Sequence, residues 1–153
     1  MKTKILVLLA ILVPLAACAA TLSPKQRAEH AARVQAAALA PISHINLINN
    51  SFYAWHAIND HQIVAYMTPT RAYLLDLPSC PGLEQTPAIM ITSRMGQVSV
   101  NFDSITTSLV GVPCQIKQIR PLDLQRLKMP AASGNMNVEI KPRPVHTDSR
   151  HQS

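Results

Sequence analysis

Three cysteines, at positions 18, 80 and 114, constrain this chain more than any other feature, because the first of them follows an export signal. Residues 1–17 begin with two lysines and continue as an uncharged apolar run from Ile5 to Ala17. The run is shorter than the roughly 20 residues of a membrane-spanning helix, and it ends in the small residues that a signal peptidase requires. The chain is therefore expected to be exported to a compartment where cysteines form disulfides.

The Leu-Ala-Ala-Cys order of residues 15–18 resembles the lipobox of bacterial lipoproteins. In that class the cysteine thiol receives diacylglycerol and the new amine is acylated, so the resemblance implies that Cys18 carries fatty acids such as palmitate. Two or more acyl chains anchor a protein stably in a membrane. Residue 19 is Ala and not Asp, which by resemblance to sorting signals implies the outer membrane. An ordinary secretory signal and an uncleaved anchor running to Leu22 remain as alternatives.

Cys80 and Cys114 are the two cysteines that remain once Cys18 carries lipid. An even remainder in an exported protein predicts a disulfide, and here only one connectivity is available. Closing the loop between them would stabilise the fold by about 3.7 kcal/mol in the chain-entropy model. The alternative is a functional thiol that ligates a haem or a metal, although the chain contains no C-x-x-C motif.

The chain divides into a signal peptide (1–17), a lipidated cysteine with a helical spacer (18–41), a β-rich domain (42–128) and a disordered tail (129–153). Ser23 to Gln26 forms a capping-box sequence that begins a helix, and Pro41 ends it. This helix either lifts the domain off the membrane or packs on the sheet. The tail is predicted from its content of Pro, Ser, Asn and Gly.

The domain is expected to be α+β: a small, mainly antiparallel β-sheet with an N-terminal helix, a short C-terminal helix and one disulfide. Short connections favour antiparallel pairing of neighbouring strands. Val98, Val100 and Phe102 are expected on one strand face, and Pro121 is expected to begin the second helix, over 121–127. The predicted strands span residues 43–48, 52–58, 61–67, 71–77, 87–93, 97–102 and 115–120.

The hairpin 52–67 carries the candidate ligand-binding residues. With Asn59-Asp60 as a two-residue turn, Tyr53, Trp55 and Tyr66 share one face, and such rings stack on sugars or grip peptides. Ordinary core packing is the competing interpretation. Arg71, beside Tyr73, either holds an anionic ligand or serves as a structural edge residue. His56 and His61 share the other face, but two histidines do not make a zinc site, so neither a metal nor a cofactor is expected.

Composition excludes several classes of function. Removal of Lys2 and Lys4 lowers the formal net charge from +6 to +4, and the chain has no basic run, so no nucleic-acid partner is expected. The four glycines form no phosphate-binding loop motif. The serines lack a G-x-S-x-G elbow and carboxylates are few, so an enzyme, a hydrolase in particular, is the weakest hypothesis.

An ordered series of short motifs resembles a family of small exported Gram-negative proteins catalogued only as a domain of unknown function. The likeness covers about residues 42–128. It implies a small extracytoplasmic domain, often with a lipoprotein signal, and pairing of Cys80 with Cys114; it brings no activity and no ligand. The motifs are Phe52-Tyr53-Ala54-Trp55, Arg71-Ala72-Tyr73-Leu74-Leu75-Asp76-Leu77, Cys80-Pro81-Gly82-Leu83, Phe102-Asp103, Cys114-Gln115-Ile116 and Ile119-Arg120-Pro121-Leu122-Asp123.

We therefore expect a cell-envelope lipoprotein, anchored in the membrane and facing the periplasm. Its domain is expected to be a non-enzymatic binding or structural module that contacts a partner protein or a cell-wall component. The alternative is a periplasmic binder of a small ligand or glycan that uses Tyr53, Trp55, Tyr66 and Arg71.

Overall fold

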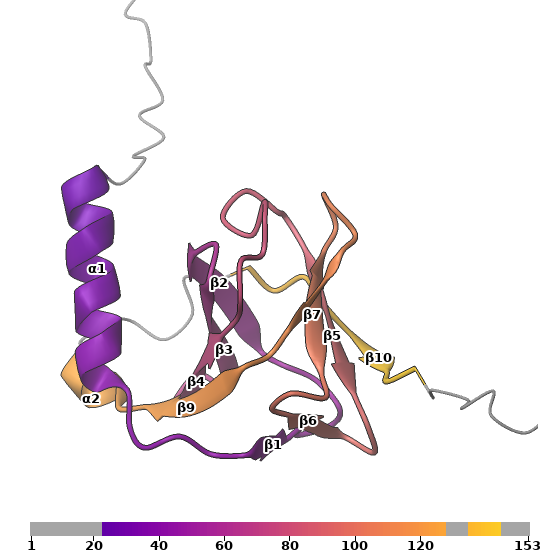
Figure 1. Cartoon of the computed structure of the whole chain (residues 1–153). Helices are drawn as coiled ribbons and strands as arrows, with labels where there is room; N and C mark the ends of the chain where they lie inside the picture. The colour runs from indigo at the N-terminus through magenta and orange to yellow at the C-terminus, as the bar shows by residue number, and fades with distance from the viewer. Residues whose placement is uncertain (1–22, 128–134, 145–153) are drawn as a thin grey trace, which may run out of the picture.

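The computed structural model describes residues 23–127 and 135–144, so the export signal and Cys18 lie outside the described residues. The described part has the expected α+β architecture, with mostly antiparallel sheets (Figure 1). Its helices are α1 (Pro24–Ala37) and α2 (Leu124–Leu127). Its strands are β1 (His44–Asn46), β2 (Ala54–Asn59), β3 (Gln62–Thr68), β4 (Arg71–Asp76), β5 (Ile89–Ser93), β6 (Gln97–Ser99), β7 (Ser104–Thr107), β8 (Pro113–Gln115), β9 (Gln118–Leu122) and β10 (Val138–Pro142).

These elements build three layers (Figure 1). The central layer is a four-stranded antiparallel sheet in the order β2-β3-β4-β9. A second sheet, in the order β10-β5-β7-β8, packs against one of its faces, and the two helices cover the other. The short pair β1-β6 lies at one end of the space between the sheets.

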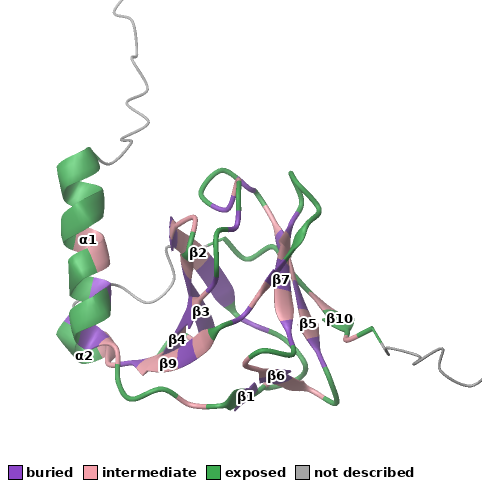
Figure 2. Ribbon diagram, viewed as in Figure 1, coloured by how far each residue is buried: buried purple, intermediate pink, exposed green. Residues whose placement is uncertain are grey.

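Two hydrophobic clusters hold the layers together. The larger fills the space between the sheets and includes Trp55, Ile63 and Leu75 from the central sheet with Ile91 and Ile105 from the second. The smaller lies under the helices. Because the central sheet is covered on both faces, β3 is buried at every position from Ile63 to Met67, as a strand inside a layered domain requires (Figure 2). The 52–67 hairpin therefore belongs to the layer that lies between the helices and the second sheet.

Helix α1 begins as its sequence predicts. The Ser23 hydroxyl accepts a hydrogen bond from the Gln26 amide, and the Gln26 side chain accepts one from the Ser23 amide. The helix buries only Val34 and Ala37, both in its C-terminal half, against the central sheet. Of the two interpretations left open, the structure supports packing on the sheet, with the N-terminal half exposed (Figure 2).

The expected strand at 115–120 is wrong, because the chain changes sheets inside it. The backbone N–H of Ile116 donates to the carbonyl of Asp103, directly before β7 in the second sheet. The backbone N–H of Lys117 instead donates to the carbonyl of Asp76, at the end of β4 in the central sheet. The segment is therefore divided between β8 and β9. Pro121 lies in β9 and does not begin a helix; it is tolerated there because β9 is an edge strand.

The prediction of a disordered tail over residues 129–153 is wrong where the chain forms β10. Val138 to Pro142 pair in parallel with Ile89 to Ser93 of β5. Local composition favoured disorder, but pairing with a strand about 50 positions earlier supplies the hydrogen bonds that a short segment cannot make alone. β7 was also missed, and β5-β10 departs from the expected antiparallel pairing. The predicted tail beyond residue 144 lies outside the described residues.

The predicted disulfide is present, with the two Cα atoms 5.6 Å apart. Cys80 follows β4, and its amide donates to Asp60 at the tip of the β2-β3 hairpin. Cys114 lies in β8, at the edge of the second sheet. The bond therefore joins the two sheets covalently.

Candidate functional site

The aromatic platform predicted on the 52–67 hairpin does not exist in the structure. Trp55 and Tyr66 are each 1% exposed and belong to different clusters, Trp55 between the sheets and Tyr66 under the helices. Tyr53 is 41% exposed but lies before β2, and Arg71 is exposed at the start of β4. The four residues therefore share no surface on which one ligand could bind.

The platform fails because the register of the hairpin is shifted. Asp60 and His61 form the turn, since Asn59 pairs with Gln62 and the Asn59 side chain accepts from the His61 amide. The register then shifts between Ala57 and Asn59, which is a β-bulge. Trp55 consequently pairs with Ala65, and a shift of one position moves a side chain to the other face.

The histidines are also separated. His56 packs between the rings of His30 from α1 and Tyr66, whereas the His61 ring contacts the carbonyl of Pro78. His44 lies on β1, in the two-stranded β1-β6 sheet. Within residues 23–127 and 135–144, no group of three or more His, Cys, Asp or Glu side chains is placed to hold a metal ion.

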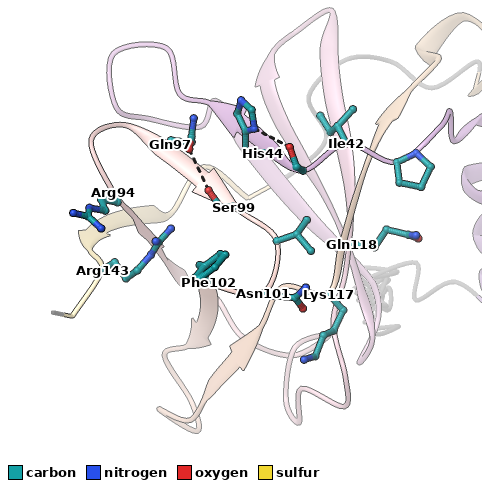
Figure 3. A pocket seen from close by; sticks show the side chains of 13 residues that line it. Ile42, His44, Arg94, Gln97, Ser99, Asn101, Phe102, Lys117, Gln118 and Arg143 are labelled. Atoms are coloured by element: carbon teal, nitrogen blue, oxygen red, sulfur yellow. Dashed lines mark hydrogen bonds between the residues drawn. The ribbon is translucent and has the colours of Figure 1, made fainter. Parts of the chain in front are cut away.

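The structure instead contains a cleft of about 750 Å³ beside the β1-β6 pair (Figure 3). This volume is within the range of ordinary ligand sites. Four separate segments contribute side chains: residues 41–44, the stretch 94–102, the crossing between β8 and β9, and the residue that follows β10. Residues that carry its chemistry are His44, Arg94, Ser99, Phe102, Lys117 and Arg143.

Positive charge dominates the cleft, because the described residues that line it include three cations and His44 but neither Asp nor Glu. Arg143 is neutralised by the buried Asp103, 2.5 Å from its guanidinium. Arg94 and Lys117 form no ion pair with a carboxylate of the described residues. The Lys117 ammonium donates to the neutral side chain of Gln115. The cleft therefore has uncompensated positive charge, which attracts an anionic group.

Phe102 gives the cleft an apolar surface. Its ring is 70% exposed and lies 5.3 Å from the Arg143 guanidinium carbon, in cation–π geometry. Figure 3 shows the ring near the middle of the cleft, with Arg94 and Arg143 on one side and Lys117 on the other. An occupant that combines a negative charge with a ring or apolar group would match this surface.

The prediction that Phe102 shares a strand face with Val98 and Val100 is wrong. β6 ends at Ser99, and Asn101 has a positive φ of 64°, so the chain turns before Phe102 and leaves its ring in solvent. Asn is one of the few residues that adopt this conformation readily, and its position directly before Phe102 was the available signal.

Nucleophilic catalysis has little support in the cleft. The Ser43 hydroxyl lies 2.9 Å from Nδ1 of His44, but both residues are exposed. No carboxylate among the described lining residues orients the imidazole, as a catalytic triad requires. The Ser99 hydroxyl is engaged with the Gln97 side chain.

Comparison with known proteins adds a family. The model described as "Family of unknown function (DUF6491)" matches residues 1–133, a range that includes the disulfide and ends before β10. No curated protein and no solved structure shows significant similarity to the chain. Within the described residues, no helix has the length and apolar character needed to cross a bilayer.

Proposed function

The chain belongs to the family of unknown function DUF6491, as its motifs suggested, and from this premise we propose that it is a lipoprotein of the cell envelope with a non-enzymatic binding domain. In this proposal Cys18 carries the lipid that anchors the chain in the outer membrane. The domain faces the periplasm and binds the anionic group of an envelope component in the cleft beside β1 and β6.

One observation carries the binding proposal: Arg94 and Lys117 line a ligand-sized cleft in which the described residues offer them no carboxylate. Cations in a concave surface concentrate anions more strongly than cations on a convex one. His44 lines the same cleft and adds an imidazole that can donate or accept a hydrogen bond. The exposed Phe102 ring supplies apolar contact area for the rest of the ligand.

The anchor proposal is supported by sequence and geometry together. Helix α1 begins at Pro24, six positions after Cys18, with its N-terminal half exposed and its C-terminal half packed on the domain. A lipid at Cys18 would thus be joined to the fold by a short connection and a helix of about 21 Å. Replacing Cys18 by Ser is expected to abolish labelling with radioactive palmitate and to release the chain from the membrane fraction; retained labelling would contradict the anchor.

The binding proposal predicts that the double variant R94Q/K117Q loses affinity for an anionic probe by tenfold or more. Isothermal titration calorimetry of the mature protein in neutral detergent would measure it. One arm uses soluble peptidoglycan fragments with free carboxylates, and the other a phosphorylated glycan, so the two sources of negative charge are distinguished. Raising the salt from 50 to 500 mM is expected to weaken binding in the unmodified chain, because salt screens exposed charges.

Two control variants sharpen this experiment. K25Q removes an exposed cation of α1, outside the cleft, and should bind as tightly as the unmodified chain. R71Q removes the exposed cation that the alternative hypothesis uses. Loss of affinity in R71Q with full affinity in R94Q/K117Q would contradict the cleft and favour a surface around Arg71. If neither probe binds, the proposal that the cleft takes an anionic ligand is wrong.

A further inference from the structure

Residues 135–143 lie along the edges of both four-stranded sheets. The backbone of Asn135 exchanges two hydrogen bonds with Trp55 in β2, at 2.7 and 2.9 Å. The Trp55 indole N–H donates to the carbonyl of Asn137, and β10 then pairs in parallel with β5. β2 ends the central sheet, and β5 would end the second sheet without β10, so this segment covers two edges at once.

The segment contributes little of its own side chains to the core. Glu139, Lys141 and Pro142 are exposed, whereas Val138 and Ile140 are partly buried against the cluster between the sheets. Its attachment rests on backbone hydrogen bonds and two alternating apolar contacts. This is the pattern of an extended peptide that adds to a sheet edge as a strand.

A single charged anchor fixes the end of the segment. Asp103 is 0% exposed, and its carboxylate accepts from the Arg143 guanidinium at both oxygens, at 2.8 and 2.5 Å. The same carboxylate accepts from the Ser99 amide and the Thr92 hydroxyl. A carboxylate held in the interior requires a cationic partner, and the forked guanidinium satisfies both oxygens where an ammonium would not.

The receiving surface and its occupant belong to different parts of the chain. Trp55, β5 and Asp103 lie inside the range that the family model matches, whereas residues 135–143 lie beyond its end at residue 133. The matched range therefore presents an edge and a buried carboxylate that a segment beyond that range fills.

We propose that the β5 edge and Asp103 form a peptide-binding site for an extended segment that carries an arginine. Residues 135–143 are its resident occupant, and a partner polypeptide with two alternating apolar residues and an arginine three positions later replaces them. Arg143 also lines the cleft, but Asp103, Trp55 and the residues of β5 do not, so the proposal rests on contacts that the anion site does not use.

The test converts the resident segment into a free ligand. A specific protease site is inserted between Leu127 and Asn135 of the full mature chain, and the chain is cut after folding. A fluorescent peptide with the sequence of residues 135–144 is then added, and its anisotropy is measured. We expect the cut protein to keep its circular dichroism spectrum and to bind the peptide saturably as the severed segment dissociates.

Variants of the peptide test the chemistry without risk to folding. Replacing the arginine that corresponds to Arg143 by alanine should weaken binding tenfold or more, because the buried carboxylate loses its partner. Replacing the lysine that corresponds to Lys141 should change affinity by less than twofold, since that side chain makes only an exposed contact with Glu139. Unfolding of the cut protein, absence of peptide binding, or equal affinities for the two variants would each overturn the proposal.

Hydrogen exchange of the uncut chain gives a second measurement. In R143A the amides of β10 should exchange at least tenfold faster, while those of β3 and β4 keep their rates. Acceleration throughout the domain would show that the segment is an integral strand and would overturn the proposal. K141A is the matched control and should leave all these rates unchanged.

Discussion

His56 lies at the interface between α1 and the central sheet, where its ring packs 5.6 Å from that of His30 and 5.8 Å from that of Tyr66. Its Nε2 atom is buried and has no hydrogen-bond partner among the described residues. Burial, together with the nearby His30, lowers the pKa of His56 from 6.5 to about 4. Burial and the charge of Arg33 lower the pKa of His30 as well. Both histidines therefore favour the neutral form in the folded chain.

This interface predicts a fold that weakens in acid. Between pH 6.5 and 4 the unfolded chain binds a proton at His56 that the folded chain does not, so stability falls as the pH decreases. The loss at His56 amounts to roughly 3 kcal/mol by pH 4. Urea unfolding at pH 7 and at pH 4 would show a clearly smaller loss in H56F than in the unmodified chain. H44Q, at an exposed histidine, is the control; equal losses in all three proteins would contradict the assignment.

Residues of the cleft show why its site was harder to predict than its neighbours. His44, Arg94, Lys117 and Arg143 come from four segments, and no short motif contains two of them. Phe102 and Asp103 did stand in a motif, but their roles diverge, one ring in solvent and one carboxylate fully buried. Alternation along a strand assigns faces only while the strand continues, and the left-handed Asn101 ends that alternation.

At the scale of elements, the N-terminal cap of α1 offers a test of how much the local sequence stabilises a helix. Removing the Ser23 hydroxyl in S23A leaves the Gln26 amide without its capping acceptor, and this should cost about 1 kcal/mol. Hydrogen exchange of the first helical turn and urea unfolding would measure the effect. S79A, at an exposed serine in a loop, is the control. A cost no larger than that of S79A would show that packing at Val34 and Ala37 alone sustains the helix.

The elements that the sequence predicted well are those determined by contacts close in the chain. The capping box and the antiparallel run β2-β3-β4 both depend on residues close to each other in the chain. At the bulge before Asn59, the Asn59 side chain accepts a hydrogen bond from the His61 amide in the turn. The crossing at residues 116–117 depends on two acceptors far away in the chain, the carbonyls of Asp103 and Asp76. β10 depends on the free edge of β5 and on the buried Asp103, neither of which local composition reveals.

For the whole molecule, the disulfide should supply a large share of the stability. The variant C80S/C114S opens a link between positions 34 residues apart and is expected to lose 2–5 kcal/mol in urea unfolding. Removing both cysteines avoids a stray thiol. The unmodified chain unfolded in strong reductant is the matched control and should give the same midpoint as the variant. A loss below about 1 kcal/mol would show that the two sheets hold together without the covalent bond.

The attachment of α1 has a mechanical consequence. A pull on the N-terminus enters the fold through α1, whose contacts belong to the smaller cluster. The helix is expected to peel from the central sheet first. Peeling should stop at the following segment, because the amides of Leu39 and Ile42 donate to β9. Beyond that point the disulfide joins the remaining layers, so tension on a tether would be relieved at the helix before it deforms the cleft beside β1 and β6.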